Sequence, residues 1–170
     1  MLKVLLFDWG DTLMRDLPEY KGAMASWPRV ETVQGVKEML SNLSTRYPCY
    51  VATNAANSNK NDVASALKRG ELLSYFQHIF TPVELKARKP SIFYYKKILD
   101  QLQVEPNECA MIGNSLKNDV IPAKKLGMTG IWYRSTVAKI QYHRKGGYWI
   151  VPRMDELPKV IRKIEKDGAT

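Results

Sequence analysis

The sequence predicts an α/β protein built on a mainly parallel sheet. Short apolar and β-branched runs alternate along the chain with segments of helical period, which is the pattern of βαβ units. The first run is apolar at nearly every position, as expected for a parallel strand that is buried on both faces. With 170 residues, 45% of them hydrophobic and 25% charged, the chain is expected to form a single domain over residues 1–170.

The first part of the chain predicts a strand, a helix and a second strand. Residues 3–7 form a short apolar run that ends at Asp8 and are predicted to be the first strand. Residues 33–46 place apolar side chains at helical spacing and predict a helix. Residues 49–53 form the next β-rich run and predict the second strand.

A second helix and a third strand follow. Residues 57–68 are predicted to be helical, with Asn57 or Ser58 as the N-cap and Gly70 just past the end. The short run at residues 78–80 predicts a strand.

The last elements continue this alternation. Residues 91–102 predict a helix that Ser91 caps and whose apolar side includes Phe93. A strand at residues 109–112 and a helix at residues 120–126 come next. The remaining elements expected are strands at 129–133 and 149–151 and a basic amphipathic helix at 155–165.

Two segments do not fit the alternation. Residues 14–32 are expected to be a small insertion that could form a partial lid. Residues 134–147 contain four Lys or Arg and no acid, and are expected to be a loop. The net charge of +9 favours an anionic substrate or partner, but for this basic segment a solvated loop is the better explanation.

Polar residues follow the ends of the predicted strands, where ligands bind in open parallel sheets. Asp8 could attack phosphorus as a covalent nucleophile, and Asp119 could share a Mg²⁺ ion with it. The Thr53 hydroxyl and the Lys89 ammonium could neutralise the oxygens of a transferring phosphoryl group. Taken singly, these residues also suit turns, helix caps and solvated surface.

Together these stretches resemble the haloacid dehalogenase (HAD) superfamily of phosphatases and phosphotransferases, in its minimal-cap form. The resemblance lies in Phe7-Asp8-Trp9-Gly10-Asp11-Thr12-Leu13, Thr53-Asn54, Lys89-Pro90 and Gly113-Asn114-Ser115-Leu116-Lys117-Asn118-Asp119. It implies a Rossmann-like, doubly wound sheet with a very small cap insertion. It further implies that Asp8 and Lys89 are catalytic, that Thr53, Asn54 and Lys89 bind the phosphate, and that Asp8, Asp119 and the Gly10 carbonyl hold Mg²⁺.

Two positions depart from the family pattern. The usual acid–base Asp is replaced by Gly10, and Asp11, one residue later, is expected to point elsewhere because successive side chains of an extended chain differ in direction. Since positioned acid–base groups contribute about 10²- to 10⁴-fold in rate, turnover should be slow or restricted to good leaving groups. Asn114 stands where the family often has a metal-binding Asp, and its amide oxygen can still coordinate Mg²⁺.

The spacing of the motifs leaves no room for a cap domain, because Thr53 follows Leu13 by 40 positions and Lys89 follows Thr53 by 36. An open cleft suits a phosphorylated small molecule or a phosphorylated macromolecule.

The sequence therefore favours a Mg²⁺-dependent phosphatase that works through an aspartyl-phosphate. A non-catalytic HAD-fold protein that binds a phosphorylated ligand or a protein partner is the contrasting hypothesis. A nucleic-acid end phosphatase or binder is the third and is disfavoured, because the aromatic residues of the basic segment are too few for a stacking platform. No apolar run predicts a membrane span, and Cys49 and Cys109 fit buried thiols of a cytoplasmic protein. The oligomeric state stays open.

Overall fold

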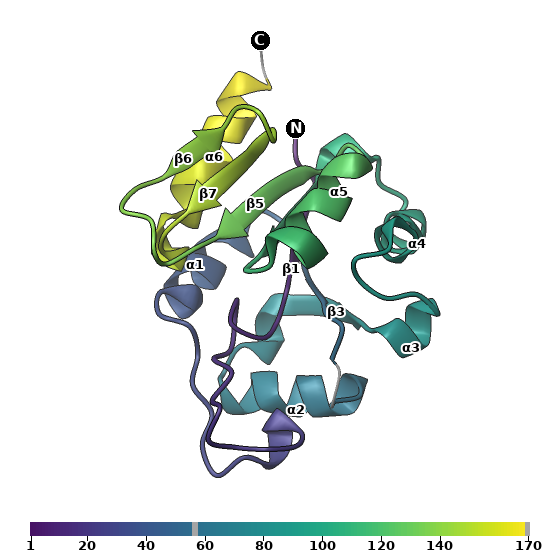
Figure 1. Cartoon of the computed structure of the whole chain (residues 1–170), viewed down its shortest axis with the longest axis vertical. Coiled ribbons are helices and arrows are strands. Elements are labelled where there is room, and N and C mark those ends of the chain that lie inside the picture. The colour runs from purple at the N-terminus through teal and green to yellow at the C-terminus, as the bar shows by residue number, and fades with distance from the viewer. Residues whose placement is uncertain (56–57, 169–170) are drawn as a thin grey trace.

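The computed structural model describes residues 1–55 and 58–168 and contains a seven-stranded sheet in the order β3-β2-β1-β4-β5-β7-β6 (Figure 1). All neighbouring strands are parallel except β6, which runs antiparallel to β7. The strands are β1 (Val4–Phe7), β2 (Cys49–Ala52), β3 (Phe76–Phe80), β4 (Cys109–Gly113), β5 (Thr129–Tyr133), β6 (Gln141–His143) and β7 (Tyr148–Val151). This confirms the predicted mainly parallel α/β fold.

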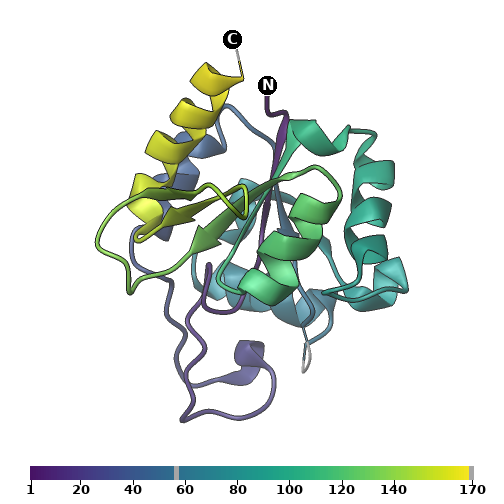
Figure 2. The same cartoon turned by 45° about the horizontal axis from the view of Figure 1, so that its top comes forward.

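Helices cover both faces of the sheet, and in the described part of the chain none of them is long and apolar enough to cross a membrane. They are α1 (Val36–Leu43), α2 (Lys60–Arg69), α3 (Pro82–Leu85), α4 (Ile92–Leu102), α5 (Ile121–Lys125) and α6 (Leu157–Asp167). Figure 2 shows α1 and α6 on one side of the sheet and α4 and α5 on the other.

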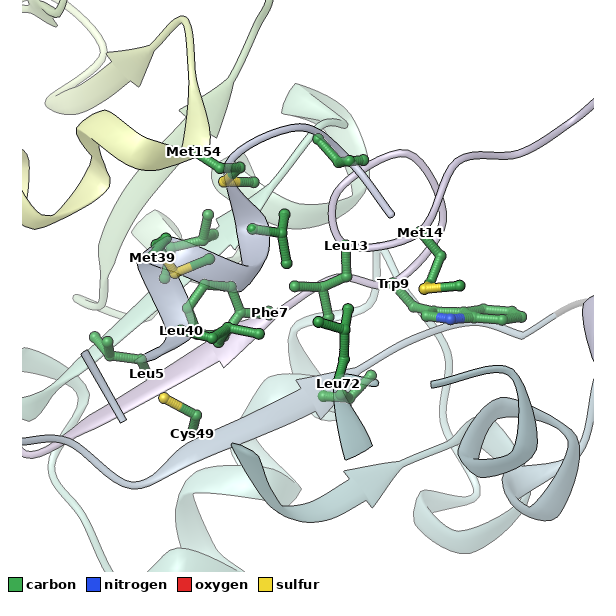
Figure 3. Packing of buried hydrophobic residues seen from close by; sticks show 14 of the residues in the cluster. Leu5, Phe7, Trp9, Leu13, Met14, Met39, Leu40, Cys49, Leu72 and Met154 are labelled. Atoms are coloured by element: carbon green, nitrogen blue, oxygen red, sulfur yellow. The ribbon is translucent and has the colours of Figure 1, made fainter. Parts of the chain in front are cut away.

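The side chains of β1 alternate between two hydrophobic cores. Leu5 and Phe7 belong to the core beneath α1, α2 and α6, whereas Val4 and Leu6 belong to the core beneath α3, α4 and α5. Figure 3 shows the first of these cores, with Leu40 of α1 near the Phe7 ring. Because every residue of β1 is buried, the end of this strand is a rigid support for whatever follows it.

The predicted helix at 33–46 is shorter in the structure. Gly35 precedes α1 with a left-handed φ of 82°, so residues 33–35 do not continue the helix, and the chain leaves it at Ser44. Gly35 also allows a close approach, because a Cβ atom there would lie 2.8 Å from the backbone nitrogen of Asp155.

The cap predicted for α2 is corrected to Asn59. The Asn59 side chain accepts a hydrogen bond from the Asp62 N–H at 2.9 Å, and the Asp62 carboxylate accepts one from the Asn59 N–H at 3.0 Å. This reciprocal pair defines the helix start. Ser58 is therefore not the cap, and Asn57 lies outside the described residues.

Three other expectations need correction. Helix α4 is capped by Ser91 as predicted, but Phe93 is 61% exposed, and Tyr94 and Tyr95 are buried instead. Part of the basic 134–147 segment forms strand β6 rather than a loop throughout. The helix predicted at 120–126 is preceded by a π-helical turn, Leu116–Val120, which the sequence pattern did not reveal.

The remaining boundaries differ by a few residues. The third strand begins at Phe76, two residues before the predicted start, and α6 covers Leu157–Asp167 rather than 155–165. The short helix α3, which was not predicted, begins at Pro82, whose fixed φ suits the first turn of a helix.

The segment 14–32 projects at the end of the sheet where β1 ends, and it packs against α2 (Figures 1 and 2). Arg69 of α2 donates hydrogen bonds to the carbonyl oxygens of Ala25, Trp27 and Pro28 at 3.1, 2.7 and 3.3 Å. Trp27 is buried in the core beneath α2. These contacts attach the segment firmly to the sheet's helical layer.

Replacing Gly35 by Ala is expected to destabilise the protein by about 1–3 kcal/mol, because the new Cβ would impose a left-handed strain and overlap Asp155. Chemical denaturation monitored by circular dichroism measures the change. Gly10→Ala is the matched control, since nothing lies within 4 Å of a Cβ at Gly10. Equal stabilities of the two variants would contradict this account of Gly35.

Candidate active site

The chain reverses its direction of winding between β1 and β4, and the residues that follow these two strands lie at the same edge. Strands β2 and β3 lie on one side of β1, and β4, β5, β7 and β6 on the other. Asp8 follows β1 and donates its backbone N–H to Ile112 of β4 at 2.9 Å. Asn114 follows β4 directly. Such a switch point is where open α/β sheets bind ligands.

A buried lysine connects two carboxylates at this edge. The Lys89 ammonium lies 2.8 Å from Asp8 Oδ1, 2.6 Å from Asp119 Oδ1 and 2.9 Å from the carbonyl oxygen of Ala52. The side chains of Lys89 and Asp119 are 3% and 1% exposed, whereas that of Asp8 is 14% exposed. We call Asp8, Lys89 and Asp119 the lysine cluster. Its members come from three distant stretches of chain, and Asp8 is the one that solvent reaches most.

The charges of the lysine cluster do not balance. Burial is the largest influence on the pKa of Lys89 and lowers it, but the charges of Asp8 and Asp119 outweigh burial, so this pKa lies above its ordinary value. Burial, followed by the charge of Asp8, raises the pKa of Asp119 to about 6, although Lys89 acts in the opposite direction. One ammonium therefore compensates the charges of the two carboxylates, Asp8 and the buried Asp119, only in part.

The turn after β4 positions Asp119. The Ser115 backbone N–H donates to Asp119 Oδ2 at 3.0 Å, and the Ser115 hydroxyl oxygen accepts a hydrogen bond from the Asn118 N–H at 3.1 Å. A Cβ atom at Gly113 would overlap the Asp119 carboxyl group, so the close approach requires glycine.

Asn54 holds the backbone of Lys89. Its side-chain oxygen accepts the Lys89 N–H at 2.8 Å, and its side-chain nitrogen donates to the Lys89 carbonyl oxygen at 3.0 Å. The Thr53 hydroxyl is buried and accepts the Ala55 N–H at 3.0 Å. Thr53 and Asn54, predicted together with Lys89 to bind phosphate, thus lie beside the lysine cluster, and Asn54 is fully engaged with the backbone of Lys89.

Three further residues shape the site and had no role in the sequence-based hypothesis. The buried Thr12 hydroxyl lies 3.2 Å from both Asp8 Oδ2 and Asn114 Oδ1, and it accepts the Asn114 N–H at 3.1 Å. The Tyr94 hydroxyl lies 2.8 Å from the carbonyl oxygen of Thr53, and the Tyr95 hydroxyl lies 2.6 Å from that of Asn118. The signal in the sequence was the placement of polar side chains within otherwise apolar stretches.

The turn at Gly10 carries no acid–base side chain toward Asp8. Asp11 adopts a left-handed φ of 55°, and its carboxylate accepts the backbone N–H of Asp16 at 2.9 Å. This confirms that Asp11 points away from the position of the missing acid.

The oxygen donors at this edge fit a hard divalent cation. Mg²⁺ binds through one or two carboxylates together with carbonyl oxygens and waters, and the lysine cluster leaves part of its negative charge uncompensated. Asp8, Asp119, the Gly10 carbonyl and the Asn114 amide oxygen are the donors available. In the described part of the chain, no group of three or more His, Cys, Asp or Glu side chains could hold a metal ion, so a site here depends on these mixed donors.

Cavities open on both sides of the lysine cluster. One of about 560 Å³ lies past Asn54, between α2 and α3, and another of about 510 Å³ lies past Asn114, near the end of β5. Space for a ligand therefore adjoins the edge of the sheet on either side.

Residues 7–133 match the model of the haloacid dehalogenase-like hydrolase family. The pyrimidine 5'-nucleotidase PynA of Streptococcus pneumoniae (strain ATCC BAA-255 / R6) is 30% identical over 105 residues, which are 61% of this chain and 43% of that protein. The chain spans about half the length of the curated relatives it matches.

Two solved structures share the fold. An uncharacterized protein from Listeria monocytogenes serotype 4b superposes with a TM-score of 0.84 at 22% identity, covering 97% of this chain and 99% of that one. YfnB from Bacillus subtilis, solved bound to magnesium, gives a TM-score of 0.66 at 20% identity, covering 78% of this chain and 56% of that one. The family match over residues 7–133 identifies this chain as a member of the haloacid dehalogenase-like hydrolase family.

Proposed function

We propose that this chain is a Mg²⁺-dependent phosphatase that hydrolyses a phosphomonoester through an aspartyl-phosphate on Asp8. The single observation that carries the proposal is the Lys89 ammonium within hydrogen-bond distance of both Asp8 and Asp119 at the switch point of the sheet. The names of matched relatives, a pyrimidine 5'-nucleotidase and a glyceraldehyde 3-phosphate phosphatase, support the reaction class.

The reaction has two steps. A carboxylate oxygen of Asp8 forms a bond to phosphorus while the ester P–O bond breaks, and the alcohol leaves with a proton from solvent. Water then attacks the phosphorus of the acyl-phosphate, the bond to Asp8 breaks, and inorganic phosphate and the free carboxylate result. Asp8 is suited to the first step because it is the most exposed member of the lysine cluster.

Lys89 orients Asp8 before attack and neutralises charge during it. All three of its N–H donors are directed at protein oxygens, one of them at Asp8 Oδ1. As Asp8 bonds to phosphorus its carboxylate loses charge, so that N–H can pass to a phosphoryl oxygen. The Thr53 hydroxyl and adjacent backbone amides are proposed to bind the other oxygens.

Mg²⁺ is proposed to be held by Asp8, Asp119, the Gly10 carbonyl and Asn114. When bound, the ion supplies the positive charge that lets a phosphate dianion approach two carboxylates. Asn114 gives the donor set one negative charge less than an aspartate would. The Thr12 hydroxyl has one proton for two acceptors, so it orients either Asp8 or Asn114 at a time.

Segment 14–32 is proposed to serve as a partial wall of the cleft, because Arg15 lines the cavity past Asn114. The proposed substrate is a phosphorylated small molecule, which the two cavities could accommodate. We place the enzyme in the cytoplasm. Support comes from the Cys49 and Cys109 thiols, which are buried and unpaired, and burial raises the pKa of Cys49 to about 12.

A non-catalytic phosphate-binding protein is the second candidate, and Gly10 is the observation that favours it. Without a carboxylate at this position, neither departure of the alcohol nor attack by water receives help from a positioned acid or base. The intact lysine cluster favours the enzyme, since a binding protein has no need of a nucleophile.

Asp8→Asn is expected to reduce phosphate release from an aryl phosphate by a factor of about 10³ or more, because the amide cannot form the acyl-phosphate. Removing the metal with a chelator should abolish release, and adding Mg²⁺ should restore it. Asp16→Asn is the matched control, since Asp16 is exposed in the same loop. Full activity of a folded Asp8→Asn variant would refute the mechanism, and no activity in the parent would favour the binding protein.

Gly10→Asp is expected to raise turnover on alkyl phosphates by about 10²-fold and to change turnover on aryl phosphates much less, because aryl leaving groups need little protonation. The space around Gly10 accepts a side chain. Steady-state kinetics on paired alkyl and aryl esters measure the effect. An unchanged alkyl rate in a variant that retains its aryl rate would count against the role assigned to position 10.

A further inference from the structure

The cavity of about 510 Å³ past Asn114 is built from that residue and from three other separated parts of the chain. The turn after β1 and segment 14–32 contribute Asp11 and Arg15, the approach to α1 contributes Gln34, and the turn after β5 contributes Arg134. It therefore lies at the carboxyl ends of the strands, on the side of the sheet away from β2 and β3.

Two side chains, those of Asn114 and Thr12, connect this cavity to Asp8. Asn114 lines it, and the Asn114 amide oxygen lies 3.2 Å from the Thr12 hydroxyl, which is itself 3.2 Å from Asp8 Oδ2. The cavity therefore adjoins the surroundings of Asp8.

Arg134 is held in a defined position at the wall of the cavity. Its guanidinium lies 4.8 Å from the centre of the Trp132 ring, and the Trp132 indole N–H donates to the Asn114 carbonyl oxygen at 2.9 Å. Its Nε donates to the Thr136 hydroxyl at 3.0 Å, and its backbone N–H donates to Val151 at 3.0 Å. The stacking and the Nε contact leave the two terminal nitrogens as the available donors.

The other charged groups of the cavity are already engaged. Arg15 pairs with Glu31 at 3.2 Å, and the Asp11 carboxylate accepts the Asp16 N–H. By contrast, no carboxylate within the described residues forms an ion pair with Arg134. The other three basic residues of the 134–147 segment flank strand β6 and do not line this cavity.

We propose that this cavity binds the alcohol part of the substrate, and that Arg134 pairs with a carboxylate carried by it. The inference rests on the proposed phosphatase function and adds the substrate class: a phosphomonoester of a hydroxy acid. A guanidinium fork matches a carboxylate with two parallel hydrogen bonds. A singly charged carboxylate fits better than a second phosphate dianion, because Asp11 lines the same space.

The test compares 4-(phosphooxy)phenylacetate and 3-(4-phosphooxyphenyl)propanoate with their methyl esters, which differ only in the remote charge. The measured quantity is the ratio of kcat/KM for each acid to kcat/KM for its ester. The parent should prefer the acids, and Arg134→Ala should lower the ratio about tenfold, as for a lost charged hydrogen bond. Arg134→Lys should lower it less, because charge remains but the fork is lost.

Arg144→Ala is the matched control, because it removes the same charge from the turn beyond β6 and should leave the ratio unchanged. If the parent and Arg134→Ala both release phosphate and show the same acid-to-ester ratio of kcat/KM, this inference is overturned and the phosphatase function still stands. An equal fall in Arg144→Ala would also overturn it, since the effect would then be long-range attraction. If the parent releases no phosphate from any of the four substrates, the two acids and their two methyl esters, both proposals are refuted together.

Discussion

The Lys89 ammonium between Asp8 and Asp119 is the contact on which the rest of this structure depends. An ammonium and a carboxylate removed from water are tolerated only when paired, and loss of one partner of such a group typically costs about 3–5 kcal/mol. Here the lysine serves two carboxylates and a backbone carbonyl. The arrangement therefore stabilises this edge of the sheet, and it carries the residual negative charge that the proposed Mg²⁺ site requires.

The fold supplies the precision that this contact requires. Strand β1 is buried on both faces and lies between β2 and β4, so Asp8 emerges from the most constrained part of the sheet. Lys89 reaches Asp8 from the loop between α3 and α4. There Asn54 holds its backbone, and the Tyr94 hydroxyl lies 2.8 Å from the carbonyl oxygen of Thr53. Gly113 has no side chain, which lets the Asp119 carboxyl group approach from the turn after β4. Each support is a contact between segments that are distant in sequence.

Much of this could be predicted from the sequence, because apolar runs that end in polar residues reveal both the strands and their carboxyl ends. Asp8, Lys89 and Asp119 were identified in that way, and the structure brings them together. Thr12, Tyr94 and Tyr95 were missed, because a polar group within an apolar stretch marks a candidate but does not reveal its hydrogen-bond partners across the fold. The early start predicted for α1 failed for the same reason: Gly35 breaks the helix where the chain passes Asp155.

The proposed function depends on phosphorylation of Asp8, and acid quenching of a single turnover detects it. An aryl phosphate is mixed with excess enzyme and Mg²⁺, the reaction is stopped in acid, and the peptides are examined by mass spectrometry. We expect the mass of one phosphoryl group on the peptide that contains Asp8, and we expect treatment with hydroxylamine to remove it. Phosphate release without any label on that peptide at any time of quenching would contradict the proposed function.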